Sequence, residues 1–136
     1  MDYLYGDTTD EIIGCFYQVI SSLGKVQGYT EKGFTKALAQ ALREQGFQVE
    51  TQVSLPEEYK GKKIGNQFAD LVVDKKVLIE VKRAVSISKR HINQLKTYLW
   101  VSGIPVGLIL NFGSEKPTIN RKEESRHYPA WYQREG

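Results

Sequence analysis

Two strand-like stretches, residues 66–73 and 77–83, are joined by only three polar residues, and this spacing restricts the fold more than any other feature. A connection this short can only join antiparallel strands, so the two stretches predict a β-hairpin. With a three-residue loop, the register of the hairpin places Asp70 directly opposite Glu80. The backbone register of the hairpin alone therefore predicts that these two acids lie side by side.

The two faces of the predicted hairpin differ in character, because side chains alternate along a strand. One face is wholly apolar and carries Ala69, Leu71, Val73, Val77, Ile79 and Val81. The other face places two acids and a lysine among apolar neighbours, with Asp70, Glu80 and Lys82 beside Phe68, Val72 and Leu78. Two carboxylates and one ammonium therefore gather at the end of the hairpin that lies away from the turn.

Carboxylates that face each other on a sheet repel, and the fold must relieve that repulsion. A bound cation, a shared proton or neutralisation by Lys82 would each do so. Carboxylate oxygens suit Mg²⁺ or Mn²⁺, so one interpretation is a metal site on Asp70 and Glu80, where Lys82 orients or helps to deprotonate an attacking water. The alternative is an ion-pair network of the same three residues, which does not explain two acids that face each other in an apolar patch.

The charge of the chain is concentrated in its middle. Residues 1–59 carry nine acids and four bases, a balance of −5, whereas residues 60–96 carry ten bases and three acids, a balance of +7. A basic band of this kind fits phosphate groups, although a solvated lysine-rich surface would give the same balance. Three basic residues close to the acidic pair are candidate phosphate contacts: Arg83, Lys89 and Arg90.

The composition excludes several classes of protein. A length of 136 residues with 40% hydrophobic residues suits one globular domain. No apolar run approaches the roughly 20 residues that span a bilayer, and the only cysteine, Cys15, cannot form an internal disulfide. We therefore expect a cytoplasmic protein without membrane association, in which Cys15 is a small buried hydrophobe. No zinc motif, glycine-rich nucleotide loop or nucleophilic serine motif is present.

Apolar periodicity predicts an α/β fold, a mixed β-sheet flanked by α-helices. Thr8 and Glu11 form a predicted capping box for the first helix, and the third helix begins near Ser86 or Ser88. Residues 57–65 are predicted to be a polar loop. Helices are expected over residues 8–23, from 29 or 30 to 45, and from 86 or 88 to 102. Strands are expected over 47–55, 66–73, 77–83 and 106–112, with a short edge strand at 118–121. Residues 1–121 would form the domain and 122–136 a polar tail with Tyr128, Trp131 and Tyr132 as docking points.

A polar stripe accompanies the apolar face of the third predicted helix. His91, Gln94 and Tyr98 recur at spacings of three and four residues, so they share one side of the helix. Gln94 would hold Lys82 or contact a phosphate. Tyr98 would stack on a base or pack at the edge of the sheet, and His91 is interpreted as a surface or packing residue.

Several short segments occur here in a characteristic order. The first is Asp70 followed, after nine intervening residues, by Glu80-Val81-Lys82. The supporting segments are residues 11–14, 23–24, 28–34, 68–71, 94–99 and 110–113. Together they span about residues 8 to 121 and resemble the PD-(D/E)XK nuclease superfamily, and more narrowly its GxxExxY group.

The resemblance implies a restriction-endonuclease-like core whose metal site lies on the hairpin. It makes Asp70, Glu80 and the backbone carbonyl of Val81 ligands of Mg²⁺ or Mn²⁺, and it makes Lys82 the catalytic lysine. Glu31 corresponds to the glutamate of the group's motif and would complete the metal shell directly or through water.

The resemblance also places Gln94 at the glutamine of the following helix. This sequence departs from the pattern of the group at two positions. The motif tyrosine is Phe34 here, and the proline before the aspartate is Ala69. The implied activity is hydrolysis of phosphodiester bonds, in DNA rather than RNA, with a homodimer expected because one small domain cuts one strand. The alternatives are a silent nuclease-like module that binds DNA ends or junctions, and a regulatory or interaction protein.

Overall fold

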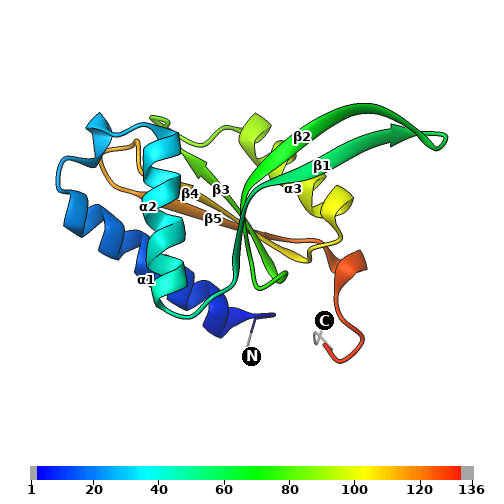
Figure 1. The fold of residues 1–136 in the computed structure, drawn as a ribbon, viewed down its shortest axis with the longest axis horizontal. Coiled ribbons are helices and arrows are strands. Elements are labelled where there is room, and N and C mark those ends of the chain that lie inside the picture. Colours follow the sequence, from blue (N-terminus) through cyan, green and yellow to red (C-terminus); the bar gives the residue numbers. More distant parts are fainter. Residues whose placement is uncertain (1–2, 133–136) are drawn as a thin grey trace.

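A five-stranded mixed sheet forms the centre of the computed structural model, which describes residues 3–132 (Figure 1). In spatial order, the strands are β1 (Val49–Tyr59), β2 (Lys62–Val73), β3 (Val77–Lys82), β4 (Val106–Asn111) and β5 (Thr118–Glu123). Strands β3 and β4 are parallel, and every other neighbouring pair is antiparallel. The mixed sheet predicted from the sequence is confirmed.

Helices cover both faces of this sheet. Helices α1 (Gly6–Leu23) and α2 (Glu31–Glu44) pack on one face, and α3 (Lys89–Ser102) packs on the other, where it forms the crossover between β3 and β4 (Figure 1). Two short 3-10 helices complete the elements, η1 (Val26–Gly28) and η2 (Ser125–His127). None of the helices described over residues 3–132 is long and apolar enough to cross a membrane.

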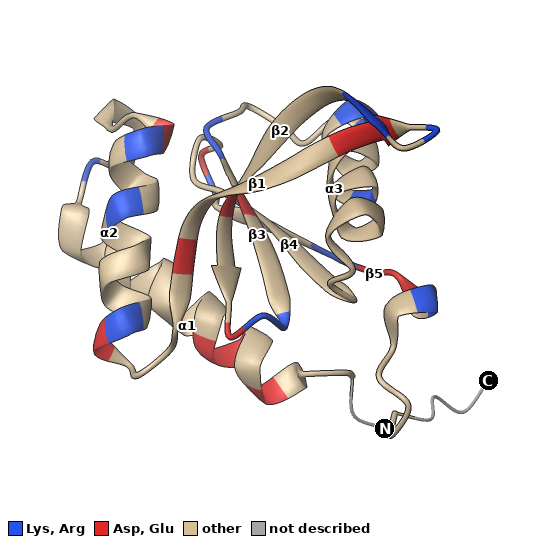
Figure 2. Ribbon diagram, turned by 45° about the vertical axis from the view of Figure 1, so that its right-hand side comes forward, with Lys and Arg blue, Asp and Glu red and all other residues tan. Residues whose placement is uncertain are grey.

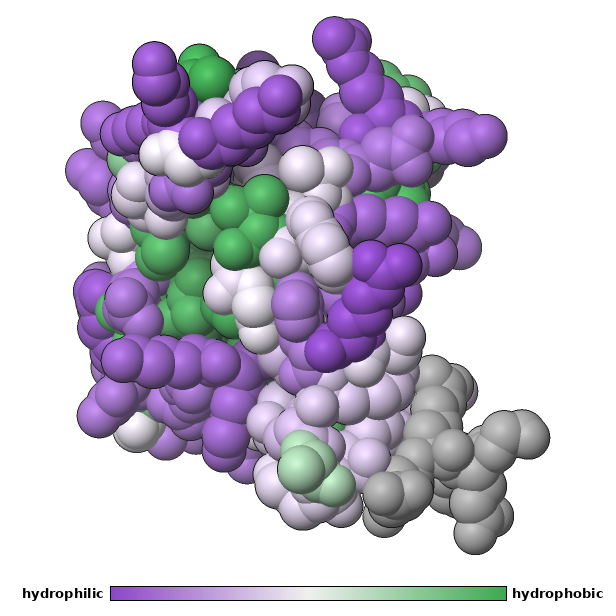
Figure 3. All heavy atoms as spheres, turned by 90° about the vertical axis from the view of Figure 1, so that its right-hand side faces the viewer, coloured by the Kyte–Doolittle hydropathy of each residue, from purple (hydrophilic) through white to green (hydrophobic). Residues whose placement is uncertain are grey.

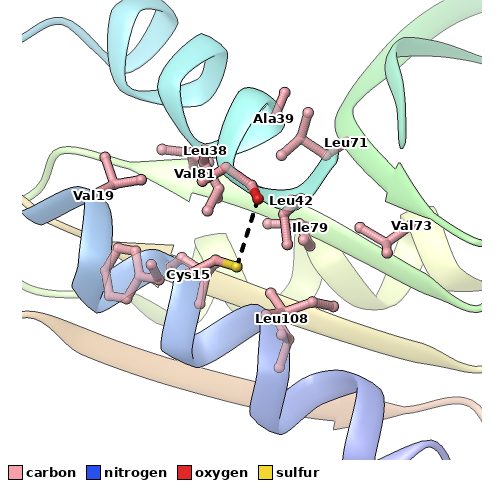
Figure 4. Close-up of a cluster of buried hydrophobic side chains, with 14 of the residues drawn as sticks. Cys15, Val19, Leu38, Ala39, Leu42, Leu71, Val73, Ile79, Val81 and Leu108 are labelled. Atoms are coloured by element: carbon pink, nitrogen blue, oxygen red, sulfur yellow. Dashed lines mark hydrogen bonds between the residues drawn. The ribbon is translucent and has the colours of Figure 1, made fainter. Parts of the chain in front are cut away.

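The layer between the sheet and helices α1 and α2 is the larger part of the core. Phe34 stacks on Phe112 with ring centroids 4.2 Å apart, and Phe16 meets Phe34 edge-on. Cys15 lies in this layer, where its thiol donates a long hydrogen bond to the Ala41 carbonyl (Figure 4). Burial raises the pKa of the Cys15 thiol, with a smaller contribution from the charge of Glu11. The thiol therefore stays protonated and acts as the predicted buried hydrophobe.

Two of the three predicted helix starts are confirmed, and one is wrong. The Thr30 hydroxyl accepts the Gly33 N–H at 2.9 Å at the start of α2, and Ser88 caps α3. Helix α1 begins at Gly6, so the predicted capping box of Thr8 and Glu11 lies inside the helix. The preceding Leu4 is 1% exposed, and its burial fixes where the chain enters the helix without a side-chain cap.

Strands β1 and β2 are much longer than predicted. The predicted polar loop over residues 57–65 is wrong, because both strands continue to a two-residue turn at Lys60 and Gly61. Both turn residues have positive φ angles, 49° and 79°, as tight hairpin turns require. Strand β2 pairs with β3 only over residues 71–73, so the outer hairpin projects past the sheet (Figure 1). We call residues 53–69 the arm.

The apolar residues of this long hairpin divide between the two core layers. The inner residues pack towards α1 and α2: Val49, Leu71 and Val73. The residues of the arm pack towards α3: Val53, Leu55 and Ala69. The sequence pattern predicted a single apolar face for each strand, and this is wrong for Val53, Leu55 and Ala69. Gln52 has a φ of 49° and does not pair with Asp70 across the ladder, so the hairpin turns its face at that point.

The side of the molecule at the arm and the C-terminal segment is not uniformly polar. Figure 3 shows an apolar area framed by hydrophilic side chains on this side. A groove runs between the arm and the C-terminal end of α3, with Val53, Leu55, Val101 and Ile104 among its lining residues. Beyond β5, Tyr128 and Tyr132 pack against the α1–α2 layer. Residues 133–136 of the predicted tail lie outside the described part of the chain.

Candidate metal centre

The hairpin of β2 and β3 brings Asp70 and Glu80 together as the predicted register requires. Backbone pairing runs from Val73 opposite Val77 to Leu71 opposite Ile79 and then stops. Beyond that point side chains replace the ladder. The Asp70 N–H donates to Glu80 Oε2 at 3.0 Å, and the Val81 N–H donates to Asp70 Oδ2 at 2.8 Å. These two hydrogen bonds therefore link β2 to β3 where the backbone pairing has stopped.

The environment of Glu80 disfavours its charged form. Its side chain is 3% exposed, and burial is the largest cause that raises the pKa of the Glu80 carboxyl, to about 9, followed by the charge of Asp70. The Asp70 side chain raises the same pKa further, as expected of two acids that share a proton. The nearby Lys82 charge lowers the same pKa but does not outweigh burial. Without a cation, a shared proton thus relieves the repulsion between the acids.

The donor set at this point fits a hard divalent cation. Each carboxylate accepts a backbone N–H on one oxygen, which fixes its orientation and leaves its other oxygen for a ligand role. The Val81 N–H points towards Asp70, and the carbonyl of the same strand residue points to the same side. Asp70, Glu80 and the Val81 carbonyl therefore offer three oxygens to a cation, which would displace the shared proton.

Lys82 is held by a helix rather than by the acids. Its Nζ donates to Gln94 Oε1 at 3.1 Å, the first of the two roles predicted for Gln94. Among residues 3–132 the only ion pair with N–O contact within 4 Å joins Arg121 and Glu123. The alternative of an ion-pair network between Lys82 and the two acids therefore has no support in the structure.

Glu31 connects the start of α2 to the end of β3. Its Oε2 accepts the Arg83 N–H at 3.1 Å, and the Arg83 guanidinium donates to the Tyr29 carbonyl at 3.1 Å. In the described part of the chain, no three Asp, Glu, His or Cys side chains gather to hold a metal ion. Glu31 thus does not join Asp70 and Glu80 directly, and its role through water stays a prediction.

The polar stripe of α3 has two structural members. His91 Nδ1 accepts the Ser88 N–H and the Ser88 hydroxyl accepts the His91 N–H, which makes His91 part of the helix cap, as its packing interpretation implied. Tyr98 is 5% exposed, and its hydroxyl donates to Gln67 Oε1 at 2.8 Å. Burial, with the charges of Glu80 and Asp70, raises the pKa of Tyr98 to about 12. Of the two predicted roles for Tyr98, the structure favours packing.

A pocket of about 570 Å³ opens beside Lys82, between α3 and the arm. Its lining is polar and includes Gln67, Arg90, His91 and Gln94. Arg90 is exposed and lines this pocket, so one predicted phosphate contact shares a pocket with Lys82. Arg83 and Lys89 are also exposed, and they are the sequence neighbours of Lys82 and Arg90. Their contacts with phosphate stay predictions.

Comparison with known proteins identifies the family. The family model of the PD-(D/E)XK nuclease superfamily matches residues 6–122, nearly all of the chain from α1 to β5. The chain belongs to the PD-(D/E)XK nuclease superfamily. A solved structure, described as the crystal structure of SSO0001, is similar in fold, with a TM-score of 0.55 and 22% identity over 88% of this chain. This chain covers 60% of that protein. No functionally curated protein matches the sequence.

Two residues that position the backbone next to the site, Asn111 and Gly113, were not assigned a role from the sequence. Asn111 is fully buried, and its Oδ1 accepts the N–H groups of Ala84 and Gly113, both at 3.0 Å. Its Nδ2 donates to the Ala84 carbonyl and to Thr118. A Cβ at Gly113 would lie 2.4 Å from the Ala84 nitrogen. Both residues lie in segment 110–113, which contributed to the resemblance, and together they hold the chain just after Lys82.

We expect Glu80→Gln to stabilise the protein when no metal is present. The pKa of Glu80 is raised from 4.5 to about 9 in the folded state, so between these pH values the folded protein holds a proton that the unfolded chain has lost. Stability of the wild type should therefore fall as pH rises through this window, by at most about 1.4 kcal/mol per pH unit. Glutamine keeps an oxygen for the Asp70 N–H and does not titrate.

Thermal denaturation in EDTA at several pH values checks this expectation. The melting temperature of the wild type should decline towards alkaline pH, and that of Glu80→Gln should decline less and lie above it at pH 8. A lower melting temperature for Glu80→Gln at every pH, with an unchanged slope, would show instead that the Glu80 charge stabilises the fold through an ion pair.

Proposed function

We propose that this chain is a metal-dependent nuclease that hydrolyses phosphodiester bonds in DNA, with Mg²⁺ or Mn²⁺ as its cofactor. Membership of the superfamily supports hydrolysis of nucleic acid. The observation that carries the proposal is the pair of carboxyls, Asp70 and Glu80, that interlock across the strand gap beside Lys82. A protein that only binds nucleic acid has no need of a buried acidic pair that destabilises its fold.

Each residue of the site has a separate task in this proposal. Asp70, Glu80 and the Val81 carbonyl would hold the cation. When bound, the cation supplies positive charge to the phosphate and makes water more acidic. Gln94 holds the Lys82 ammonium through one of its three donors, and the others are available to a water or a phosphate oxygen. The water oxygen bonds to phosphorus and loses a proton to solvent, the bond from phosphorus to the leaving sugar oxygen breaks, and that oxygen takes up a proton from solvent.

We further propose that the chain belongs to the GxxExxY group. Glu31 and Gln94 occupy the motif positions, and both make contacts next to the site, with the Arg83 N–H and with Lys82. Phe34 replaces the motif tyrosine. Because Phe34 is fully buried and stacks on Phe112, this position supports the core under α2 and gives no hydroxyl to the reaction.

A cleavage assay with purified protein tests the proposed function. Linear, circular, branched and single-stranded DNA, with matched RNA, are incubated with Mg²⁺, Mn²⁺ or EDTA. We expect cleavage of DNA with either metal and none with EDTA or with Asp70→Asn. Binding without cleavage under every condition would favour the silent module instead, and equal cleavage by Asp70→Asn would place the activity outside this site.

A further inference from the structure

The arm carries an aromatic side chain that the core does not use. Phe68 on β2 is 50% exposed and belongs to neither buried cluster. Its neighbour Ala69 is fully buried in the α3 layer, and Gln67 bonds to Tyr98 on the same side. Because side chains alternate along a strand, Phe68 points to the opposite, open face of the arm. Half of the phenyl ring is therefore open to a ligand on this face.

Phe68 lies next to the proposed catalytic centre. It precedes Asp70 by two residues on the same strand, which places their Cα atoms about 7 Å apart at the usual rise per residue. The root of the arm cannot move freely, because Leu55 and Ala69 are buried against α3 and Gln67 is bonded to Tyr98. The ring is therefore held close to the acids by the core.

Basic side chains lie on both sides of this region. The turn of the arm carries Lys60 and Lys62, together with Lys63, which faces Glu58 across the ladder. Figure 2 shows basic residues at the tip of the β1–β2 hairpin, acidic residues beside them on β1, and further basic residues on α3. The pocket between arm and helix contains Lys82 and Arg90. This pocket lies on the side of Gln67, and Phe68 does not line it. A single strand that follows the open face of the arm towards Asp70 would have the tip lysines at one end and Lys82, beside the acids, at the other.

We propose that the arm binds single-stranded DNA, with its tip lysines on the phosphates and Phe68 stacked on a base next to the bond that is cut. The inference rests on the proposed function, which it deepens by naming the form of the substrate. An aromatic ring can stack on a base only where that base is unpaired, and exposed rings near basic side chains are a usual means of binding single strands. In duplex DNA the face of each base is covered by its neighbours, so Phe68 would have no partner.

Binding is measured separately from cleavage. Fluorescence anisotropy in EDTA follows a labelled oligonucleotide, single-stranded or annealed to its complement, with wild-type protein and variants. We expect the wild type to prefer the single strand, and Phe68→Ala to weaken that binding by about tenfold, whereas Phe68→Tyr retains it. Lys60→Gln with Lys62→Gln should reduce the slope of log affinity against log salt by about 1.4.

The matched control lies at the opposite end of the same strand. Lys75→Gln with Lys76→Gln removes the same charge from the β2–β3 turn, away from the acids, and should leave the preference for single strands unchanged. Melting curves verify that each variant folds, which we expect for Phe68→Ala because the ring lies outside both clusters.

The outcomes separate this inference from the proposed function. Unchanged affinity in Phe68→Ala, an equal loss in the Lys75/Lys76 control, or tighter binding of duplex would overturn the role of the arm, even if the protein cuts DNA. A change of oligomeric state in the arm variants, without loss of binding, would overturn it too and assign the arm to contacts between copies of the chain. Arm-dependent binding of single strands without any cleavage would support the proposed role of the arm and contradict the proposed nuclease function.

Discussion

Substituting Asp70→Asn, Glu80→Gln or Lys82→Ala should slow DNA cleavage by at least about two orders of magnitude. The first two substitutions remove negative charge from the oxygens that would hold the cation. The third removes the ammonium that Gln94 holds beside the acids. Glutamine and asparagine keep an oxygen that can accept the same backbone N–H groups, so the fold should remain. Initial rates on labelled DNA with Mg²⁺ measure the effect, and circular dichroism verifies the fold.

Lys75→Ala is the control for these rates. Lys75 is exposed at the turn of the same hairpin, at the end away from the acids, and its removal should leave the rate within about twofold. If any of the three site variants cleaved as fast as the Lys75 variant, the interlocked acids would not be the catalytic centre.

Gly113→Ala should lower the free energy of unfolding by about 3 kcal/mol and the melting temperature by roughly 10 °C. A Cβ at this position would lie 2.4 to 2.7 Å from backbone atoms of Arg83 and Ala84, and backbone cannot move aside as the end of a flexible side chain can. The segment that must shift follows Lys82 directly. Activity should therefore fall together with stability, as measured by thermal denaturation and by the cleavage rate.

Gly14→Ala is the matched control for this substitution. Gly14 is exposed in helix α1, and a Cβ there would meet no atom within 4 Å, so alanine should stabilise the helix by about 0.5–1 kcal/mol. Equal melting temperatures for the two alanine variants would mean that the close approach of Gly113 to the end of β3 does not affect the free energy of unfolding.

The sequence predicted the position of the acids because the hairpin leaves little choice. A three-residue turn between apolar stretches fixes the register, and a shift by one residue would expose the apolar face. Asp70 therefore had to meet Glu80. The same pattern could not show that backbone pairing stops there, because the carboxylates replace the ladder only where the strands separate.

The arm was missed because its sequence resembles a loop. Residues 57–65 are mostly polar and include Gly61 and Gly65, and an apolar period is the main sign of a strand. The arm lies partly outside the sheet, so it needs no such period. The change of face at Gln52 depends on a positive φ angle, which glutamine rarely adopts and which no sequence pattern indicated.

Contacts between distant segments account for the remaining differences. Asn111 and Ala84 are separated by 27 residues, and no local pattern pairs an asparagine with a strand end so far away. Glu31 was assigned through the resemblance, which gives a residue but not its distance from the acids. The burial of Leu4 overrode a plausible capping signal in the same way, because packing outweighs local preference.

Calorimetric titration of metal-free protein with Mn²⁺ measures whether Asp70 and Glu80 together hold a cation. The wild type should bind one ion with a dissociation constant in the millimolar range or tighter, Lys82→Ala should bind it similarly, and Asp70→Asn should lose binding. No heat of binding to the wild type, or equal binding to Asp70→Asn, would show that the two acids meet for a reason other than a cation.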